Sequence, residues 1–209
     1  MNQLYYSGEG CWISDQWQFN GLRTLIMENT HLRVVILIDK GTDIVEFRYK
    51  PKDTDFLLHM PDGVKNPQHD TPSAYSGGTF LDYFSGGWNE VLPNGGPFVN
   101  YRGAELGQHG EVSLVPWRYV ILTNTPDEVQ VRFRVDAIRT PLTVEKTLTL
   151  RRGEAKLIID ETLTNRAGEA VDCMWGQHIA FGRPFLDEGA VIDVPECKFI
   201  VHEAMEGYE

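Results

Sequence analysis

Three neighbouring runs of alternating polar and apolar residues constrain the fold of this chain more than any other feature. They are the segments 128–135, 142–150 and 156–165. Successive side chains of a β-strand point to opposite faces of a sheet, so this alternation predicts strands with one buried and one solvated face. The short segment 151–154, which contains a glycine, is typical of a hairpin loop between the second and third runs. The sequence therefore predicts an antiparallel meander.

Further strand signals lie nearer the N-terminus. The β-branched run 32–38 is followed by a turn at 39–41 and by an alternating run at 42–49. No segment shows strong helical periodicity, so we expect an all-β chain that forms one large antiparallel β-sandwich domain over residues 1–209. The proline-rich stretch 51–75 predicts a long loop, either functional or disordered. Segment 196–202 begins another strand, and we expect the sandwich to need further strands beyond residue 209.

The charge balance limits the partners that this chain can bind. The net charge is −11 and the isoelectric point is about 5.0, which argues against nucleic acid and against an anionic membrane surface. The longest apolar run is strand-sized, and the first residues lack the features of a signal peptide. The three cysteines are widely spaced and predict neither disulfides nor a zinc site. We therefore expect a cytoplasmic protein that binds a neutral small molecule; the sequence does not specify its oligomeric state.

The segment 86–111 contains the first candidate site residues. It combines many glycines and prolines with Trp88, Asn94, His109 and Glu111, a mixture that is too aromatic for an idle linker. A flat aromatic ring can cover the apolar face of a sugar, while amides, carboxylates and imidazoles bind its hydroxyl groups. This composition predicts a sugar-binding segment.

A second cluster, residues 175–181, contains Trp175, Gln177 and His178. Both His109 and His178 follow a Gly-Gln pair, and we expect both on strands, with His109 at the start of a strand over 112–117. Each histidine could instead tie down a loop or fill the core, and the tryptophans could be core residues. Metal-ligand spacings, a serine-hydrolase elbow and dinucleotide or phosphate loops are absent from the sequence, which predicts no metal and no cofactor. Histidine, with a pKa near neutrality, suits acid–base chemistry.

Segments 29–44, 93–110 and 177–181 resemble the aldose 1-epimerase (galactose mutarotase-like) family, and the resemblance runs across nearly the whole chain. It implies a galactose mutarotase-type sandwich and the interconversion of the anomers of an aldose. His109 matches the family's substrate-binding histidine, and His178 matches the histidine that acts as general acid on the ring oxygen. The family's arginine in the preceding turn is replaced: Asn94 is its nearest match, and Arg102 is a possible surrogate.

The general base of that family is a glutamate near its C-terminus, for which this sequence offers no match. Glu203, Glu206 and Glu209 come too early in the pattern, so we expect the base beyond residue 209 and little activity from residues 1–209 alone. Glu90 and Glu111 are the first alternatives within the chain. Two other functions stay open: a non-catalytic carbohydrate-binding protein on the same fold, and a β-sandwich domain of a glycoside-processing enzyme.

Overall fold

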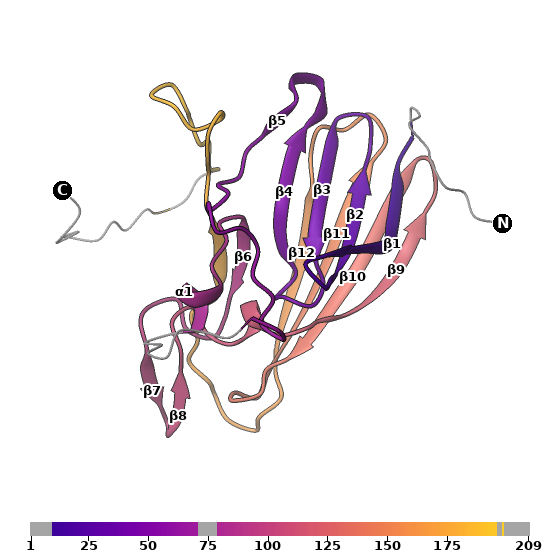
Figure 1. Ribbon diagram of the computed structural model, residues 1–209. Coiled ribbons are helices and arrows are strands. Elements are labelled where there is room, and N and C mark those ends of the chain that lie inside the picture. Colours follow the sequence, from indigo (N-terminus) through magenta and orange to yellow (C-terminus); the bar gives the residue numbers. More distant parts are fainter. Residues whose placement is uncertain (1–9, 71–78, 196–197, 199–209) are drawn as a thin grey trace.

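Two antiparallel β-sheets lie face to face in the computed structural model, which describes residues 10–70, 79–195 and 198 (Figure 1). The larger sheet consists, in spatial order, of β1 (Trp12–Phe19), β2 (Leu22–Glu28), β3 (Leu32–Leu37), β4 (Asp43–Tyr49), β6 (Trp88–Val91) and β13 (Gly176–Ile179), with the short β5 (Thr54–Asp55) paired to β4. The smaller sheet consists of β12 (Ile158–Asn165), β11 (Leu142–Arg151), β10 (Glu128–Asp136) and β9 (Arg118–Asn124). The all-β, antiparallel sandwich that the sequence predicts is therefore confirmed.

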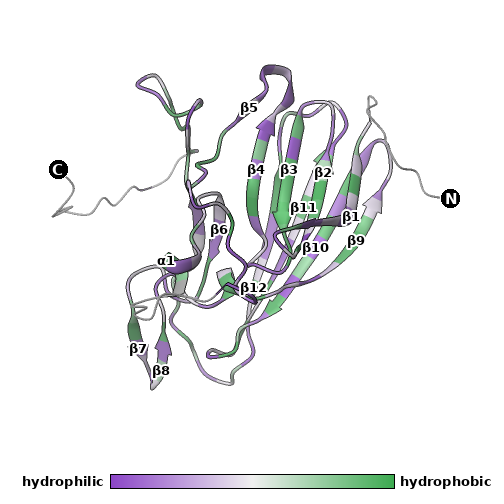
Figure 2. Cartoon of the chain, viewed as in Figure 1, coloured by the Kyte–Doolittle hydropathy of each residue, from purple (hydrophilic) through white to green (hydrophobic). Residues whose placement is uncertain are grey.

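The smaller sheet is the predicted meander, and its alternation builds one side of the core. In β10 every second residue from Val129 to Val135 is buried, whereas Arg132 and Arg134 are exposed. The inward residues pack against those of the larger sheet, among them Leu25 and Ile36, which are fully buried. Apolar residues accordingly run along the strands of both sheets (Figure 2). Burial of this interface is the main stabilising contribution to such a fold.

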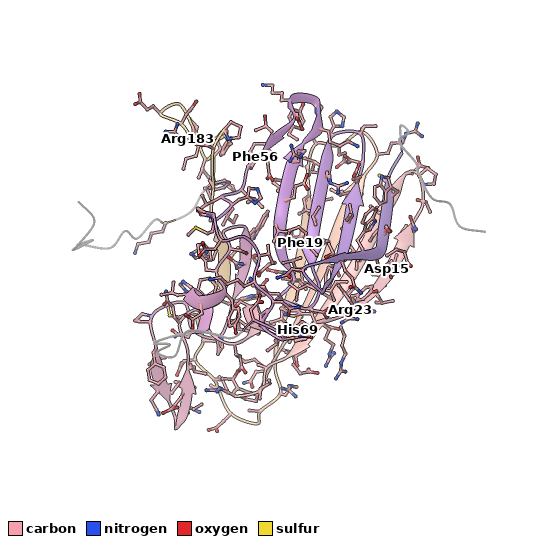
Figure 3. The ribbon with its side chains drawn as sticks, viewed as in Figure 1. Asp15, Phe19, Arg23, Phe56, His69 and Arg183 are labelled. Atoms are coloured by element: carbon pink, nitrogen blue, oxygen red, sulfur yellow. The ribbon has the colours of Figure 1, made fainter. Side chains whose placement is uncertain are left out.

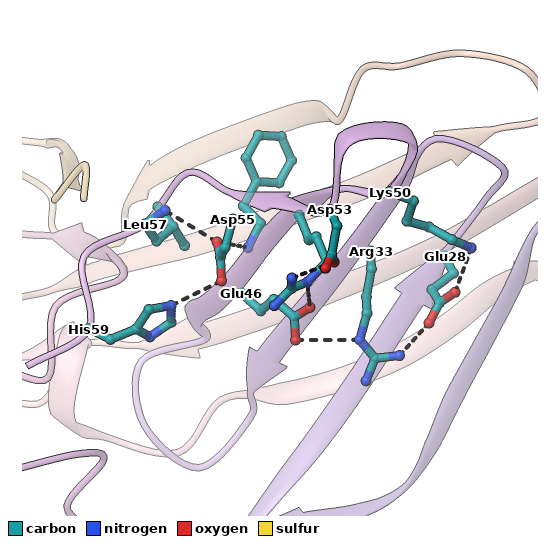
Figure 4. A network of polar contacts seen from close by, with 10 residues as sticks. Glu28, Arg33, Glu46, Lys50, Asp53, Asp55, Leu57 and His59 are labelled. Atoms are coloured by element: carbon teal, nitrogen blue, oxygen red, sulfur yellow. Dashed lines mark hydrogen bonds and ion pairs between the residues drawn. The ribbon is translucent and has the colours of Figure 1, made fainter. Parts of the chain in front are cut away.

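A β-bulge in the larger sheet decides which side chains of β4 face the core. The pairing of β3 with β4 shifts between Val35 and Ile36, so Ile44 faces the core and Glu46 faces outward. The outer face of β2, β3 and β4 carries alternating charges (Figure 4). Arg33 contacts both Glu28 and Glu46, and its Nε lies 3.4 Å from the Glu46 carboxylate. This end of the outer face is therefore polar and partly solvated.

The proline-rich stretch has little regular structure in its described part. It contains a 3-10 turn, η1 (Lys50–Lys52), and isolated bridges from Leu57 to Phe181 and from His59 to Gly86. The rings of Phe56 and Phe185 lie 4.8 Å apart, so this stretch packs against the segment that follows β13 (Figure 3). Residues 71–78 lie outside the described residues.

One predicted strand is wrong. The segment 112–117 contains the 3-10 turn η2 (Val112–Leu114) instead of a strand. The turn lets Val112 and Trp117 both point into the core, where the indole N–H of Trp117 donates to the carbonyl oxygen of Val112 at 2.9 Å. Burial of this large ring thus outweighs the β-propensity of the segment.

Three further predictions concern residues that lie partly or wholly outside the described part of the chain. The strand expected at 196–202 and the glutamates at 203, 206 and 209 lie outside them. Cys11 and Cys173 are free thiols, and Cys197 is likewise outside the described part. Across the described ranges, no helix has the length and apolarity needed to cross a membrane.

Candidate functional site

His109 and His178 lie side by side, although they come from segments far apart in the sequence. Their ring centroids are 5.0 Å apart, and the planes of the rings are tilted by 45°. His178 is on β13, whose register with β6 places it directly opposite Asn89. His109 is in the turn before η2, not at the start of a strand as the sequence predicts. We call these two residues the histidine pair.

The turn that carries His109 has an unusual backbone. His109 has a φ of 58°, and the following Gly110 has a φ of 81°. The backbone at Gly110 forms a bridge to Leu92, and a β-carbon at position 110 would lie 2.0 Å from the Leu92 carbonyl oxygen. Only glycine permits this close approach, and it fixes where the chain turns. Two consecutive residues with positive φ exclude the strand that the sequence predicts here.

Hydrogen bonds fix the orientation of the His109 ring. Its Nδ1 lies 3.0 Å from the carbonyl oxygen of Gly95, an acceptor, which assigns the ring proton to Nδ1. Nε2 carries the lone pair of the ring and accepts a long hydrogen bond, at 3.5 Å, from the Gln108 side-chain amide. Burial lowers the pKa of His109, and nearby His178 lowers it further, against the raising effect of the Gly95 carbonyl. His109 is therefore neutral at neutral pH and offers an acceptor nitrogen.

Helix α1 (Thr79–Tyr83) and the residue after it give the histidine pair an aromatic wall. Phe80, which is buried, meets the His109 ring edge-on at a centroid distance of 4.5 Å and the His178 ring at 5.8 Å. Phe84 meets the His178 ring edge-on at 5.5 Å. These rings restrict the rotation of both imidazoles and exclude water from one side of each.

Asn94 organises the loop that carries Gly95 and Gly96. Its side-chain nitrogen donates to the carbonyl oxygens of Pro97 at 2.6 Å and Gly107 at 3.0 Å, and its oxygen accepts from the N–H of Gly96 at 3.1 Å. All its polar atoms are thus engaged by the loop itself. Asn94 holds the Gly95 carbonyl beside His109 and contributes to the site through the loop.

Arg102 and Glu111, which the sequence predicts as ligand-binding residues, have other contacts. Arg102 lies in the turn between β7 (Val99–Tyr101) and β8 (Ala104–Leu106), where it stacks over the Tyr101 ring and pairs with Glu169 at 3.4 Å. The carboxylate of Glu111 accepts from the backbone N–H groups of Ile138 and Arg139 at 2.9 to 3.1 Å. The histidine pair therefore does not gather these two side chains.

Trp175 and Gln177 both contact Glu90, on the opposite face of the larger sheet from His178, and Trp88 contacts Gln177. The Trp175 indole N–H donates to Glu90 at 2.6 Å, and the Gln177 amide donates to Glu90 at 2.7 Å. The Gln177 oxygen accepts from the Trp88 indole N–H at 2.7 Å. Glu90 contacts Lys146 of the smaller sheet, so Glu90, Gln177 and Trp88 face the interior of the sandwich, whereas Trp175 is 39% exposed. Because side chains alternate along β6 and β13, Asn89 and His178 face outward.

Lys146 and Glu161 also belong to this inner polar cluster, and the sequence did not predict them as site residues. Lys146 contacts Glu90 at 3.1 Å and lies 5.0 Å from the centre of the Trp117 ring. The Gln177 amide also donates to Glu161 at 2.9 Å. Both residues occupy inward positions of alternating strands, where an apolar residue is expected. A charged residue at such a position is the sequence signal that could have identified them.

The charges of the inner cluster are strongly coupled. Burial and the adjacent Glu90 carboxylate raise the pKa of Glu161 to about 7, against the lowering effects of Lys146 and Gln177. The pKa of Glu90 is lowered: burial raises it, but Lys146 and the hydrogen bonds from its neighbours outweigh that effect. One of the two carboxylates is therefore ionised, and the other titrates near neutral pH. The described part of the chain shows no group of three histidine, cysteine or acidic residues arranged to hold a metal ion.

Comparisons with known proteins add a family but no activity. The family model described as "Domain of unknown function (DUF4432)" matches residues 19–206. The chain matches no curated protein. Among solved structures it is similar to a TPR-domain containing protein from Parabacteroides distasonis ATCC 8503, with 17% identity and a TM-score of 0.43. That match covers 65% of this chain and 20% of the other, so the chain spans about a fifth of that protein's length.

Proposed function

We propose a function from the geometry of the site, because the chain belongs to the DUF4432 family and the description of that family, a domain of unknown function, names no activity. The histidine pair binds an aldose, and His178 transfers a proton to and from the ring oxygen, so that the protein interconverts anomers as aldose 1-epimerases do. The observation that carries the proposal is the contact between His109 and His178, whose ring centroids are 5.0 Å apart.

The two imidazoles offer different chemistry. His109 has its Nδ1 proton bound to a backbone carbonyl, and its Nε2 can accept from a sugar hydroxyl that displaces the long contact with Gln108. The Nδ1 atom of His178 is buried and has no hydrogen-bond partner among the described residues. His109 is thus suited to orient a ligand, whereas His178 is free to give or take a proton.

The reaction requires two proton transfers. An acid protonates the ring oxygen while a base removes the proton of the C1 hydroxyl; the ring opens, the aldehyde rotates, and reclosure gives the other anomer. Neither of the carboxylates first considered as base fits the position beside His178. Glu90 faces the interior of the sandwich, and Glu111 is bound by two backbone N–H groups. This observation favours a second candidate function, aldose binding without catalysis.

Polarimetry separates the two candidates. Freshly dissolved α-D-galactose and α-D-glucose are followed with and without the protein, and binding of each sugar is measured by calorimetry. We expect residues 1–209 to bind the sugar, and wherever anomer equilibration is accelerated, His178→Asn should lower that acceleration about 10²- to 10⁴-fold with binding largely retained. His109→Asn should mainly weaken binding. Binding without acceleration in the unmodified protein would establish the second candidate, and the absence of both would refute the proposal.

A further inference from the structure

A row of polar side chains continues from His178 across the outer face of the larger sheet. Asn89 on β6 lies directly opposite His178 on β13. The pairing of Ile44 with Trp88 places Asp43, the first residue of β4, next to Asn89 in the same row. Since Ile44 and Trp88 pack against the core, the residues beside them face outward. Asp43, Asn89 and His178 therefore form one cross-strand row, which we call the outer polar row.

The outer polar row is buried, and several of its polar atoms lack hydrogen-bond partners among the described residues. Asn89 is 0% exposed and Asp43 is 1% exposed. Within the described residues, hydrogen-bond partners are missing for one Asp43 oxygen, both amide atoms of Asn89 and Nδ1 of His178. The large majority of buried polar side-chain atoms in proteins are paired, and an unpaired one is destabilising. A row of such atoms indicates that something else satisfies them when the protein is at work.

The inner face of the same two strands shows the opposite condition. Glu90 and Gln177, the neighbours of Asn89 and His178 in the sequence, have hydrogen bonds on every side-chain polar atom. The missing partners are thus confined to one face of β6 and β13, the face that carries the histidine pair. A general shortage of polar groups near these strands does not explain them.

Asp43 gives the row a fixed charged end. Its other oxygen pairs with the buried Lys40, which comes from the turn between β3 and β4. Burial raises the pKa of Asp43, against the lowering effects of Lys40 and Asn89. The Asn89 amide is thus close enough to Asp43 to affect its ionisation, yet makes no hydrogen bond of ordinary geometry. A small movement of the amide would let Asp43 hold it while its remaining polar atoms stay free.

We propose that Asn89 is a ligand-binding residue of the site that contains the histidine pair, and that it binds two adjacent hydroxyl groups of a polyol. The amide oxygen accepts from one hydroxyl and the amide nitrogen donates to the next, which uses both unpaired atoms. Asp43 is the positioning residue that orients the amide. The proposal rests on the proposed function for the location of the site, and it adds a recognition element: a vicinal diol beside the atom that His178 protonates.

The test compares two leucine variants that remove an asparagine amide at similar side-chain size. Asn89→Leu removes an amide that has no hydrogen-bond partner among the described residues, whereas Asn94→Leu removes one that four backbone groups engage. Replacement of an unpaired buried amide by an apolar group is neutral or stabilising, but loss of a paired one is destabilising. We expect the thermal midpoint to be unchanged or higher in Asn89→Leu and to be lower by several degrees in Asn94→Leu.

Binding is measured with D-galactose and with myo-inositol, which has vicinal hydroxyls but no anomeric carbon. We expect the unmodified protein to bind both and Asn89→Leu to bind each at least about 10-fold more weakly, the equivalent of one lost hydrogen bond. Asp43→Asn should weaken both less. Unchanged binding by Asn89→Leu, or a lower midpoint like that of Asn94→Leu, would overturn the proposal.

The two ligands also separate this proposal from the proposed function. Binding of myo-inositol that depends on Asn89, without acceleration of anomer equilibration, would refute the catalytic function and leave the diol site standing. Accelerated anomer equilibration of galactose that Asn89→Leu leaves unchanged would refute the diol site and leave the catalytic function standing. If the unmodified protein bound neither compound, both proposals would be wrong.

Discussion

The ion pair between Glu90 and Lys146 lies between the two sheets and allows a quantitative test of how the inner polar cluster is stabilised. The side chain of Glu90 is 0% exposed and that of Lys146 is 5% exposed, with 3.1 Å between the charged atoms. Lys146→Met keeps the length of the side chain and its packing on Trp117 but leaves the Glu90 carboxylate without a countercharge. Removal of one partner from a buried pair costs about 3 to 5 kcal/mol of folding free energy.

The pH dependence of that loss identifies its cause. Without Lys146, burial raises the folded-state pKa of Glu90, so the folded protein binds a proton more readily than the unfolded chain does. Stability of the variant then falls as the pH rises through the range between these two pKa values. The loss in Lys146→Met should therefore be larger at pH 8 than at pH 5.5. The hydrogen bonds from Trp175 and Gln177 limit the effect, because they stabilise the ionised form.

Urea unfolding of four proteins measures the coupling: the unmodified chain, Lys146→Met, Glu90→Gln and the double variant. We expect the double variant to recover much of the loss, because both buried charges are gone, with a coupling energy of about 2 kcal/mol. Arg134→Met breaks the exposed pair of Arg134 with Glu145 and should cost less than about 1 kcal/mol. A loss below about 1 kcal/mol for Lys146→Met at pH 8, with no dependence on pH, would refute the buried ion pair.

Two other outcomes follow from the structure. Because the pKa of Glu161 is raised to about 7, the folded protein holds this proton more tightly than the unfolded chain, so stability falls as the pH rises from about 4.5 to 7. Glu161→Gln should remove about 1 to 2 kcal/mol of this pH dependence, after a discount for solvent screening. Identical urea unfolding profiles for the variant and the unmodified protein across this pH range would contradict the prediction. Gly110→Ala should lower the thermal midpoint far more than Gly103→Ala. Both glycines have positive φ, but only at Gly110 would the new methyl group meet the Leu92 backbone, at 2.0 Å. Equal decreases in the thermal midpoint would show that the fold does not require this close approach.

Two strands with clean alternation were predicted almost to the residue, whereas β9 alternates as cleanly and was not predicted. The runs 142–150 and 128–135 correspond to β11 and β10, because each has one face in the core and one in solvent. β1 was not predicted, since its register shifts between Ser14 and Trp17 and breaks the alternation. The five-residue α1 was also missed; a helix of little more than one turn carries no periodicity that a sequence can reveal.

The candidate site was only partly predictable for a different reason. The repeated Gly-Gln-His pattern selected two histidines that lie in contact, but it gave no information on the backbone at His109, whose positive φ depends on the loop around it. Alternation along β13 shows that Gln177 and His178 face opposite ways, but not which of them faces inward. The smaller sheet decides that question, because Lys146 and Glu161 supply the partners that Glu90 and Gln177 need.

Strand β13 thus has two faces with different roles. On the inner face Gln177 is bound by Trp88, Glu90 and Glu161, which fixes the strand against β6 and against the smaller sheet. On the outer face, a nitrogen of His178 and the adjacent amide of Asn89 have no hydrogen-bond partners within the part of the chain that the structure describes. A binding site needs this combination, because side chains that must engage a ligand can stay unpaired only if neighbouring contacts hold their backbone in place. The fully bonded inner cluster therefore supports the proposal that the outer face is where the ligand binds.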